Sequence, residues 1–268
     1  MGYFSPGESA RLFFEVIFLF AIGNARKSSL YNYRKSAGHP RTDLIRTQRR
    51  IYSISENNII FFSFLFFSMI SKLARIFGSK TKAQEILLLV AGLKPVVRQG
   101  FYEYELPQVE QFCKENEIYL VKSGFKVHLA DGSNYSNKGI RLPVTDLRPG
   151  MFFVYLSLDQ YKAWQASHFE AAGKDKELGL LLGYPGCCVD FFCKRFSEQN
   201  PNLQLKPTNM FTNLTKRAAD QVLLSHFPCN SDCVGSIALG KKYLGLIRKW
   251  DRERAEELEK ELLLLRIA

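Results

Sequence analysis

Three stretches in the middle of the chain decide the predicted fold: VVRQGFYEY at residues 96–104, IYLVKSGFKVHL at 118–129 and MFFVYLSL at 151–158. Each is rich in β-branched and aromatic residues, a composition typical of strands. The pairs Asp131-Gly132 and Pro149-Gly150 are turn signals that bracket the loop before the third stretch. Together they predict a small, mainly antiparallel sheet of three or four strands.

Helical patterns surround these strands. Residues 81–93 predict a helix that ends before Pro95, and residues 107–117 predict a second one between the first two strands. In the second half we expect helices over the ranges 160–172, 175–182, 185 onward, 215–225 and about 230 toward the end. The order predicts an α+β fold with a small sheet flanked by helices, a helical C-terminal half and a long C-terminal helix.

The net charge of +11 over 268 residues is concentrated at the N-terminal end. Residues 1–80 contain twelve basic and four acidic side chains and half of the 22 phenylalanines. This composition predicts two parts. The first is a basic, Phe-rich helical segment at 1–80, and the second is an α+β domain at 81–268 that carries the cysteine site.

Two apolar runs in the first part, Leu12 to Ile22 and Ile59 to Ile70, predict helices that are buried or covered by a partner. At about 1.5 Å per residue they reach roughly 16–18 Å, which is short of the ~30 Å of a bilayer core. Because basic residues flank the second run, peripheral attachment to an anionic membrane surface is the other interpretation. Nucleic acid is the least expected partner, since basic loops between apolar helices are common.

The start of the chain does not have the features of a secretory signal, because Glu8 offsets Arg11 and Glu15 interrupts the first apolar run. We therefore expect a cytoplasmic protein with reduced thiols. Glycine-rich phosphate loops, dinucleotide fingerprints, G-x-S-x-G and H-E-x-x-H are absent from the sequence. Nucleotide-binding, serine-hydrolase and zinc-protease functions thus lose their main support.

Five of the six cysteines lie in two groups, GYPGCC followed by Cys193 and HFPCNSDC at 226–233. Each group is expected at a helix start. Pro185 suits the first helical position, with Cys187 and Cys188 in the first turn. In the second group Asn230 is the expected N-cap and Cys233 the third helical residue. Free N–H groups and a partial positive charge at helix N-termini favour thiolates.

We predict that Cys187, Cys188, Cys229 and Cys233 ligate zinc or an iron–sulfur cluster. Adjacent cysteines are expected to chelate a small ion awkwardly because successive side chains diverge, which favours the larger cluster. His226 is the candidate catalytic residue, as a proton donor or acceptor beside the centre. It could also replace one sulfur as a ligand or hydrogen-bond to one.

The other two cysteines are not expected at the site. Cys193 shares a helical stripe with Val189, Phe192 and Phe196 and is predicted to lie in the core. Cys113 sits among polar residues in a separate predicted helix, where no special role is expected.

Two other functions remain open beside a metal-binding protein with redox or transferase activity. The first is a metal-free enzyme in which a first-turn cysteine is the nucleophile and His226 is its base. The second is a scaffold protein whose cysteines are structural and whose residues 1–80 contact a membrane or a partner. The partner in the enzymatic cases would be a small molecule or another protein.

The cysteine motifs resemble a known family. The pattern Leu182-Gly183-Tyr184-Pro185-x-Cys187-Cys188-Val189-x-x-Phe192, followed by His226-x-Pro228-Cys229-x-x-x-Cys233-x-x-Ser236, is similar to the uncharacterised prokaryotic family labelled domain of unknown function 483. Residues 91–95 also resemble it, and the likeness is expected to cover about 84–245. The resemblance supports a site at the cysteines and implies no particular activity.

Overall fold

The computed structural model describes residues 69–129 and 139–263, which belong to one compact unit that begins at Ser68. Residues 1–68 lie outside the described residues, and with them the basic stretch, the first apolar run and most of the second. No helix in the described ranges has the length and apolar character needed to cross a membrane.

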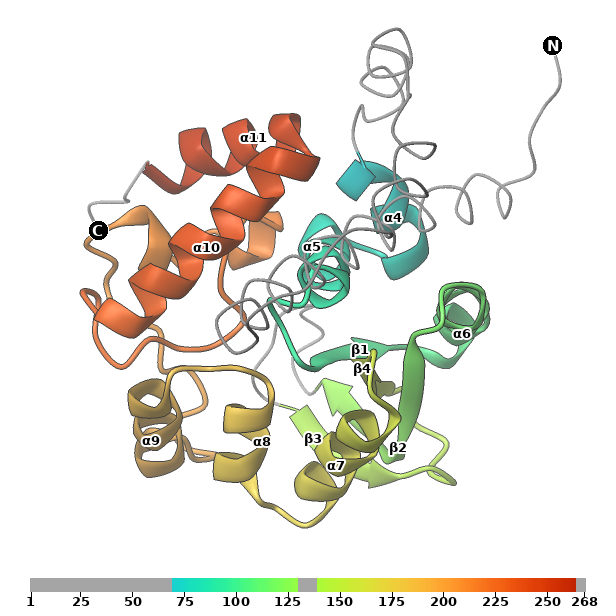
Figure 1. Ribbon diagram of the computed structural model, residues 1–268. Coiled ribbons are helices and arrows are strands. Elements are labelled where there is room, and N and C mark those ends of the chain that lie inside the picture. Colours follow the sequence, from blue (N-terminus) through green and yellow to red (C-terminus); the bar gives the residue numbers. More distant parts are fainter. Residues whose placement is uncertain (1–68, 130–138, 264–268) are drawn as a thin grey trace, which may run out of the picture. The chain divides into compact units, whose positions relative to one another are not determined.

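Four antiparallel strands form one sheet in the order β1-β4-β2-β3 (Figure 1). They are β1 Val97–Phe101, β2 Tyr119–Leu129, β3 Gly139–Pro143 and β4 Met151–Ser157. The β2–β4 ladder is interrupted by an irregularity between Lys122 and Lys126. The three predicted strand stretches are confirmed, and β3 pairs with the end of β2 as the fourth.

Helices surround the sheet, as the α+β prediction required. Those before and between the strands are α4 Met69–Phe77, α5 Lys80–Val90, the 3₁₀ turn η1 Glu103–Glu105 and α6 Leu106–Glu115. Those after it are α7 Gln160–Ala171, α8 Asp175–Leu181, α9 Gly186–Arg195, η2 Met210–Thr212, η3 Arg217–Ala219, α10 Val234–Trp250 and α11 Arg252–Leu263.

Alternate residues of β1 point to opposite faces of the sheet. Gln99 faces α5, where its amide donates to the carbonyl of Lys82 at 2.9 Å. Arg98 faces α7 and donates two hydrogen bonds of 2.5 Å to the carboxylate of Glu170. The ion pair between Arg98 and Glu170 therefore lies on the α7 face of the sheet.

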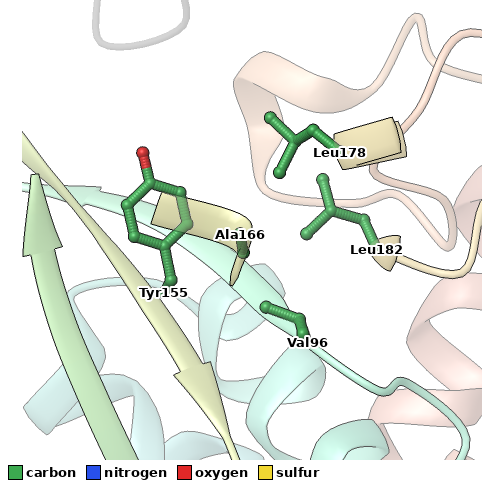
Figure 2. Close-up of a cluster of buried hydrophobic side chains, with 5 residues drawn as sticks. All are labelled: Val96, Tyr155, Ala166, Leu178 and Leu182. Carbon is green, nitrogen blue, oxygen red and sulfur yellow. The ribbon is translucent and has the colours of Figure 1, made fainter. Parts of the chain in front are cut away.

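A buried cluster ties α7 and α8 to the sheet (Figure 2). It comprises Val96, Tyr155, Ala166, Leu178 and Leu182. Directly after it, Gly183 adopts a φ of 81°, which glycine tolerates without the cost that a Cβ brings. A Cβ at this position would also lie 3.1 Å from Cδ of Pro95. The cluster and this turn fix the point from which α9 starts.

The helix predicted over residues 215–225 is wrong. Only η3 forms there, and it ends at Asp220 in the left-handed conformation with a φ of 59°. The Asp220 carboxylate accepts hydrogen bonds from the backbone N–H groups of Lys80 at 2.5 Å and Thr81 at 2.9 Å. Because it satisfies free N–H groups at the start of α5, this distant contact outweighs the local helical preference.

The C-terminal helix is divided at Asp251, which has non-helical φ and ψ of −150° and 87°. Its buried carboxylate accepts from the backbone N–H of Ile70 at 2.7 Å and from that of Arg254 at 3.0 Å. Asp251 therefore caps α11 and joins it to the start of the described chain.

Asp251→Ala should lower the free energy of unfolding by about 2–3 kcal/mol, because it removes a cap and leaves the buried N–H of Ile70 without its charged acceptor. Guanidinium denaturation followed by circular dichroism measures this loss. The control is Arg252→Ala, whose side chain is 84% exposed in its ion pair with Glu256 and should matter by less than about 1 kcal/mol. Equal losses in both variants would contradict the capping role.

Candidate metal centre

The first cysteine pair projects from the start of α9. Pro185 is the N-cap and Gly186 the first helical residue, so Pro185 lies one position earlier than predicted. Cys187 and Cys188 occupy the first turn as expected, the former exposed and the latter buried. Their sulfur atoms are 4.0 Å apart. The expected divergence of neighbouring cysteines therefore does not prevent them from reaching one site.

The second pair lies in a turn that precedes α10. Cys233 is the N-cap of α10, so the prediction that places it inside the helix is wrong. Asn230 does not cap the helix either, because its side-chain oxygen accepts from the N–H of Asp232 at 2.9 Å within the turn. The N–H of Cys233 then donates to the carbonyl of Asn230 at 3.2 Å. This turn, rather than helical spacing, brings Cys229 and Cys233 together.

The four sulfur atoms of Cys187, Cys188, Cys229 and Cys233 all lie within 4.8 Å of one another, and we call this group the cysteine centre. Sγ of Cys233 is 3.7 Å from that of Cys187 and 3.5 Å from that of Cys188. Four sulfurs gathered in this way could hold a metal ion.

Gly235 allows the two segments to approach. A Cβ at this position would lie 3.0 Å from Cβ and 3.3 Å from Cγ of Pro185. Both contacts are closer than most Cβ atoms make, so a larger residue would require Pro185 to shift by a few tenths of an ångström. Glycine at position 235 therefore permits the close contact between the two helix starts.

Hydrogen bonds surround the buried sulfur of Cys188. The N–H of Cys229 donates to it at 3.4 Å, and Oγ of Ser236 lies 3.2 Å away. The same hydroxyl is 2.9 Å from Nε2 of His226. Among the described residues no hydrogen bond joins His226 to a thiol, so the predicted catalytic histidine reaches the centre through Ser236. Such outer contacts orient ligands and tune their basicity.

The thiols differ in their readiness to ionise. Burial raises the pKa of Cys233, but hydrogen bonds from the side chain and backbone of Ser236 and from the neighbouring thiols lower it to about 6. Burial raises the pKa of Cys229 to about 11 and that of Cys188 further still. Without a cation, one thiolate is therefore favoured at neutral pH, and a bound metal would have to displace the remaining protons.

His226 is 6% exposed and uncharged at neutral pH. Burial and the positive charges of Lys94 and Arg217 lower its pKa to about 3. Lys94 is buried in an ion pair of 2.8 Å with Glu85 and also donates to Oγ of Ser225 at 3.0 Å. In the predicted role in proton transfer, His226 would therefore act as a neutral imidazole near the positive charge of Lys94.

Residues 164–263 match the family described as "Protein of unknown function (DUF483)". The resemblance to DUF483 is confirmed. The DUF483 match begins after the sheet and extends further toward the C-terminus than the expected range of 84–245. Both helix starts that carry the cysteine centre lie inside it. No curated protein and no solved structure matches the chain.

The DUF483 segment also contains Cys193, for which the prediction of a core position is wrong. Cys193 is exposed on α9, while Val189 and Phe192 of the same helix and Phe196, its C-cap, line a cavity. Of the four residues of the predicted stripe only Val189 is buried, and α9 ends before Phe196. Cys113, outside the DUF483 match, is buried in α6 and stands apart from the centre.

This cavity has a volume of about 520 Å³ and reaches the cysteine centre. Cys188 and His226 line it on the side of α9 and the following loop, and Arg98, Arg141 and Phe153 line it on the side of the strands. Sequence reasoning did not anticipate the cavity or the arginines, because their residues come from strands and helices far apart in the chain. Ser236 could be identified from the sequence, since it is the third residue after Cys233 in the second cysteine motif.

Proposed function

We propose that the protein binds one zinc ion through Cys187, Cys188, Cys229 and Cys233. The observation that carries this proposal is the spacing of the sulfur atoms. A tetrahedral site with Zn–S near 2.3 Å separates its sulfurs by roughly 3.7 Å. The distances of 3.5, 3.7 and 4.0 Å among the sulfurs of Cys187, Cys188 and Cys233 agree with that value, and the sulfur of Cys229 lies within 4.8 Å of these three.

The same spacing favours a single ion over an iron–sulfur cluster. In a cluster, the four ligand sulfurs are distributed over two or four iron atoms, so as a set they lie further apart than ligands of a single ion. All four sulfurs of this centre are within 4.8 Å of one another. A mononuclear site therefore needs only small adjustments of the side chains, whereas a cluster would require the two helix starts to separate.

The ligand set indicates a structural role for the zinc. Four cysteines complete a tetrahedron and leave no position open for water or substrate, which is the arrangement of structural zinc sites. Two ligands come from α9 and two from the turn before α10. The ion would join these segments and hold the wall of the cavity to which Cys188 belongs.

A metal-free thiol enzyme is the second candidate, and the low pKa of Cys233 is the observation in its favour. However, Cys233 is 4% exposed and stands in a group of four thiols. His226, the base that this mechanism requires, contacts Ser236 instead. Burial of the most acidic thiol and the absence of a paired base among the described residues favour metal binding.

Metal analysis of the full-length chain purified without oxygen tests the proposal. We expect about one zinc per chain, no colour, and, after exchange with Co²⁺, the intense visible absorption of tetrahedral thiolate coordination. Cys193→Ser should bind the same amount of zinc, because its thiol is exposed outside the centre. Iron accompanied by acid-labile sulfide, or a chain that binds neither metal, would contradict zinc binding.

A further inference from the structure

The cavity beside the cysteine centre has the dimensions and lining of a small-molecule site. Its volume of about 520 Å³ falls in the range of ligand pockets, which are roughly 300–1,000 Å³. Most of its wall is aromatic or aliphatic, with Phe125, Phe153, Phe192 and Leu178 among the contributors. A ligand with an apolar body therefore fits most of the interior.

Arginines supply the polar groups on the strand side. The guanidinium of Arg98 lies 3.7 Å from the centre of the Phe153 ring, and that of Arg141 lies 4.0 Å from the centre of the Phe125 ring. A guanidinium that lies over a ring keeps its N–H groups pointing outward in its own plane. The rings thus hold both cations in fixed orientations at the wall of the cavity.

The two arginines differ in how their charges are balanced. Arg98 is neutralised by Glu170, which accepts two hydrogen bonds of 2.5 Å from it and one of 2.7 Å from the hydroxyl of Tyr155. Arg141 donates to the backbone carbonyl of Glu170 at 3.3 Å and forms no ion pair with a described residue. Arg141 therefore retains a charge and N–H groups for a ligand.

The remaining charges of the lining support an anion. Arg217 and Asp175 also line the cavity, so its described wall has three arginines against two carboxylates. Burial and the charge of Glu170 raise the pKa of Asp175, although the charges of Arg141 and Arg98 act in the opposite direction.

We propose that this cavity binds a small organic anion, with its carboxylate, phosphate or sulfonate at Arg141 and its apolar body among the phenylalanines. This inference goes beyond the proposed zinc site and does not depend on it. Anionic oxygens accept charge-assisted hydrogen bonds from a guanidinium, and the aromatic wall removes the apolar body from water. The result is a site selective for the combination of both features.

The test compares two fluorescent probes on the full-length protein. They are 1-anilinonaphthalene-8-sulfonate, which is an anion, and N-phenyl-1-naphthylamine, which has similar rings and no charge. We expect saturable binding of the anion at one site, and displacement of it by 1-naphthoate or 1-naphthyl phosphate. Arg141→Met should weaken the anion about tenfold and leave the neutral probe nearly unchanged, because only the charge-assisted contact is lost.

Two further variants guard against a general effect on folding. Asp175→Asn removes a negative charge from the lining and should strengthen binding of the anion severalfold. Arg148→Met removes an arginine that is paired with Asp146 outside the cavity and should change neither probe. Equal weakening of both probes by Arg141→Met, unchanged binding of the anion in that variant, or failure of both naphthyl anions to displace it would overturn the inference. Zinc content, measured in the same samples, separates this outcome from loss of the metal.

Discussion

Removal of the proposed zinc ion with a chelator should lower the free energy of unfolding of the protein by about 4 kcal/mol or more. A ligand that binds only the folded state contributes about 4.1 kcal/mol when its concentration is a thousand times its dissociation constant. We expect zinc to bind the cysteine centre in the folded state alone, because its four ligands come from two segments that folding brings together. Guanidinium denaturation with and without chelator, under a reducing agent, measures the difference.

Cys188→Ser identifies the source of this effect. Cys188 is buried and its sulfur has the closest contacts, at 3.5 Å to Cys233 and 3.2 Å to Ser236. The variant should unfold at the same guanidinium concentration with and without chelator, since it no longer holds the ion. Cys193→Ser is the matched control on the same helix and should keep the full response. If the chelator strips the metal from the wild-type protein and its unfolding does not change, the structural role is wrong.

The sequence predicts the parts of the fold that depend on local patterns. The three strand stretches around residues 97–101, 119–129 and 151–157 are β-rich and bounded by turns, and the structure has strands there. The first turn of α9 is also predicted, because Pro185, a residue typical of helix starts, precedes Cys187 and Cys188. Each of these features is determined by a few residues that are neighbours in the sequence.

Distant contacts decide the parts that local patterns miss. Residues 215–225 have helical composition, yet Asp220 is used to cap α5, some 140 positions earlier. Asn230 has the chemistry of an N-cap, but it stabilises a turn and Cys233 caps α10 instead. For the centre, the sequence motifs indicate which cysteines group together, whereas the short distances between their sulfurs accompany the close approach of Gly235 to Pro185.

Lys94→Met should destabilise the protein by about 4 kcal/mol, the second large effect that we expect. Removal of one partner from a buried ion pair typically costs 3–5 kcal/mol, because the other charge is left without compensation. The side chains of Lys94 and Glu85 are 1% and 8% exposed, with 2.8 Å between Nζ and Oε1. Burial alone would lower the pKa of Lys94, but Glu85, Tyr184 and Tyr243 raise it above its usual value, so the lysine is fully charged at neutral pH.

Comparison with a partly exposed pair measures the contribution of burial. Lys80 and Glu257 are 2.9 Å apart with side chains 41% and 28% exposed, and Lys80→Met should cost less than about 1 kcal/mol. The double variant Glu85→Leu/Lys94→Met should recover most of the stability lost in Lys94→Met, since neither charge is then buried alone. Guanidinium denaturation of the three variants distinguishes this from a simple packing defect, in which the double variant would be the least stable.

The Lys94–Glu85 pair also affects the cysteine centre, because Lys94 contacts residues that lie beside it. Its ammonium donates to Ser225 at 3.0 Å and lies 5.3 Å from the centre of the Tyr184 ring, which in turn packs against His226 with centroids 4.9 Å apart. The double variant can therefore separate the effect of Lys94 on the stability of the fold from its effect on the position of the loop before Cys229. If the pair only stabilises the fold, this variant should bind zinc as the wild-type protein does. If Lys94 also fixes the loop before Cys229, stability should return while zinc affinity stays reduced, and we expect this second result.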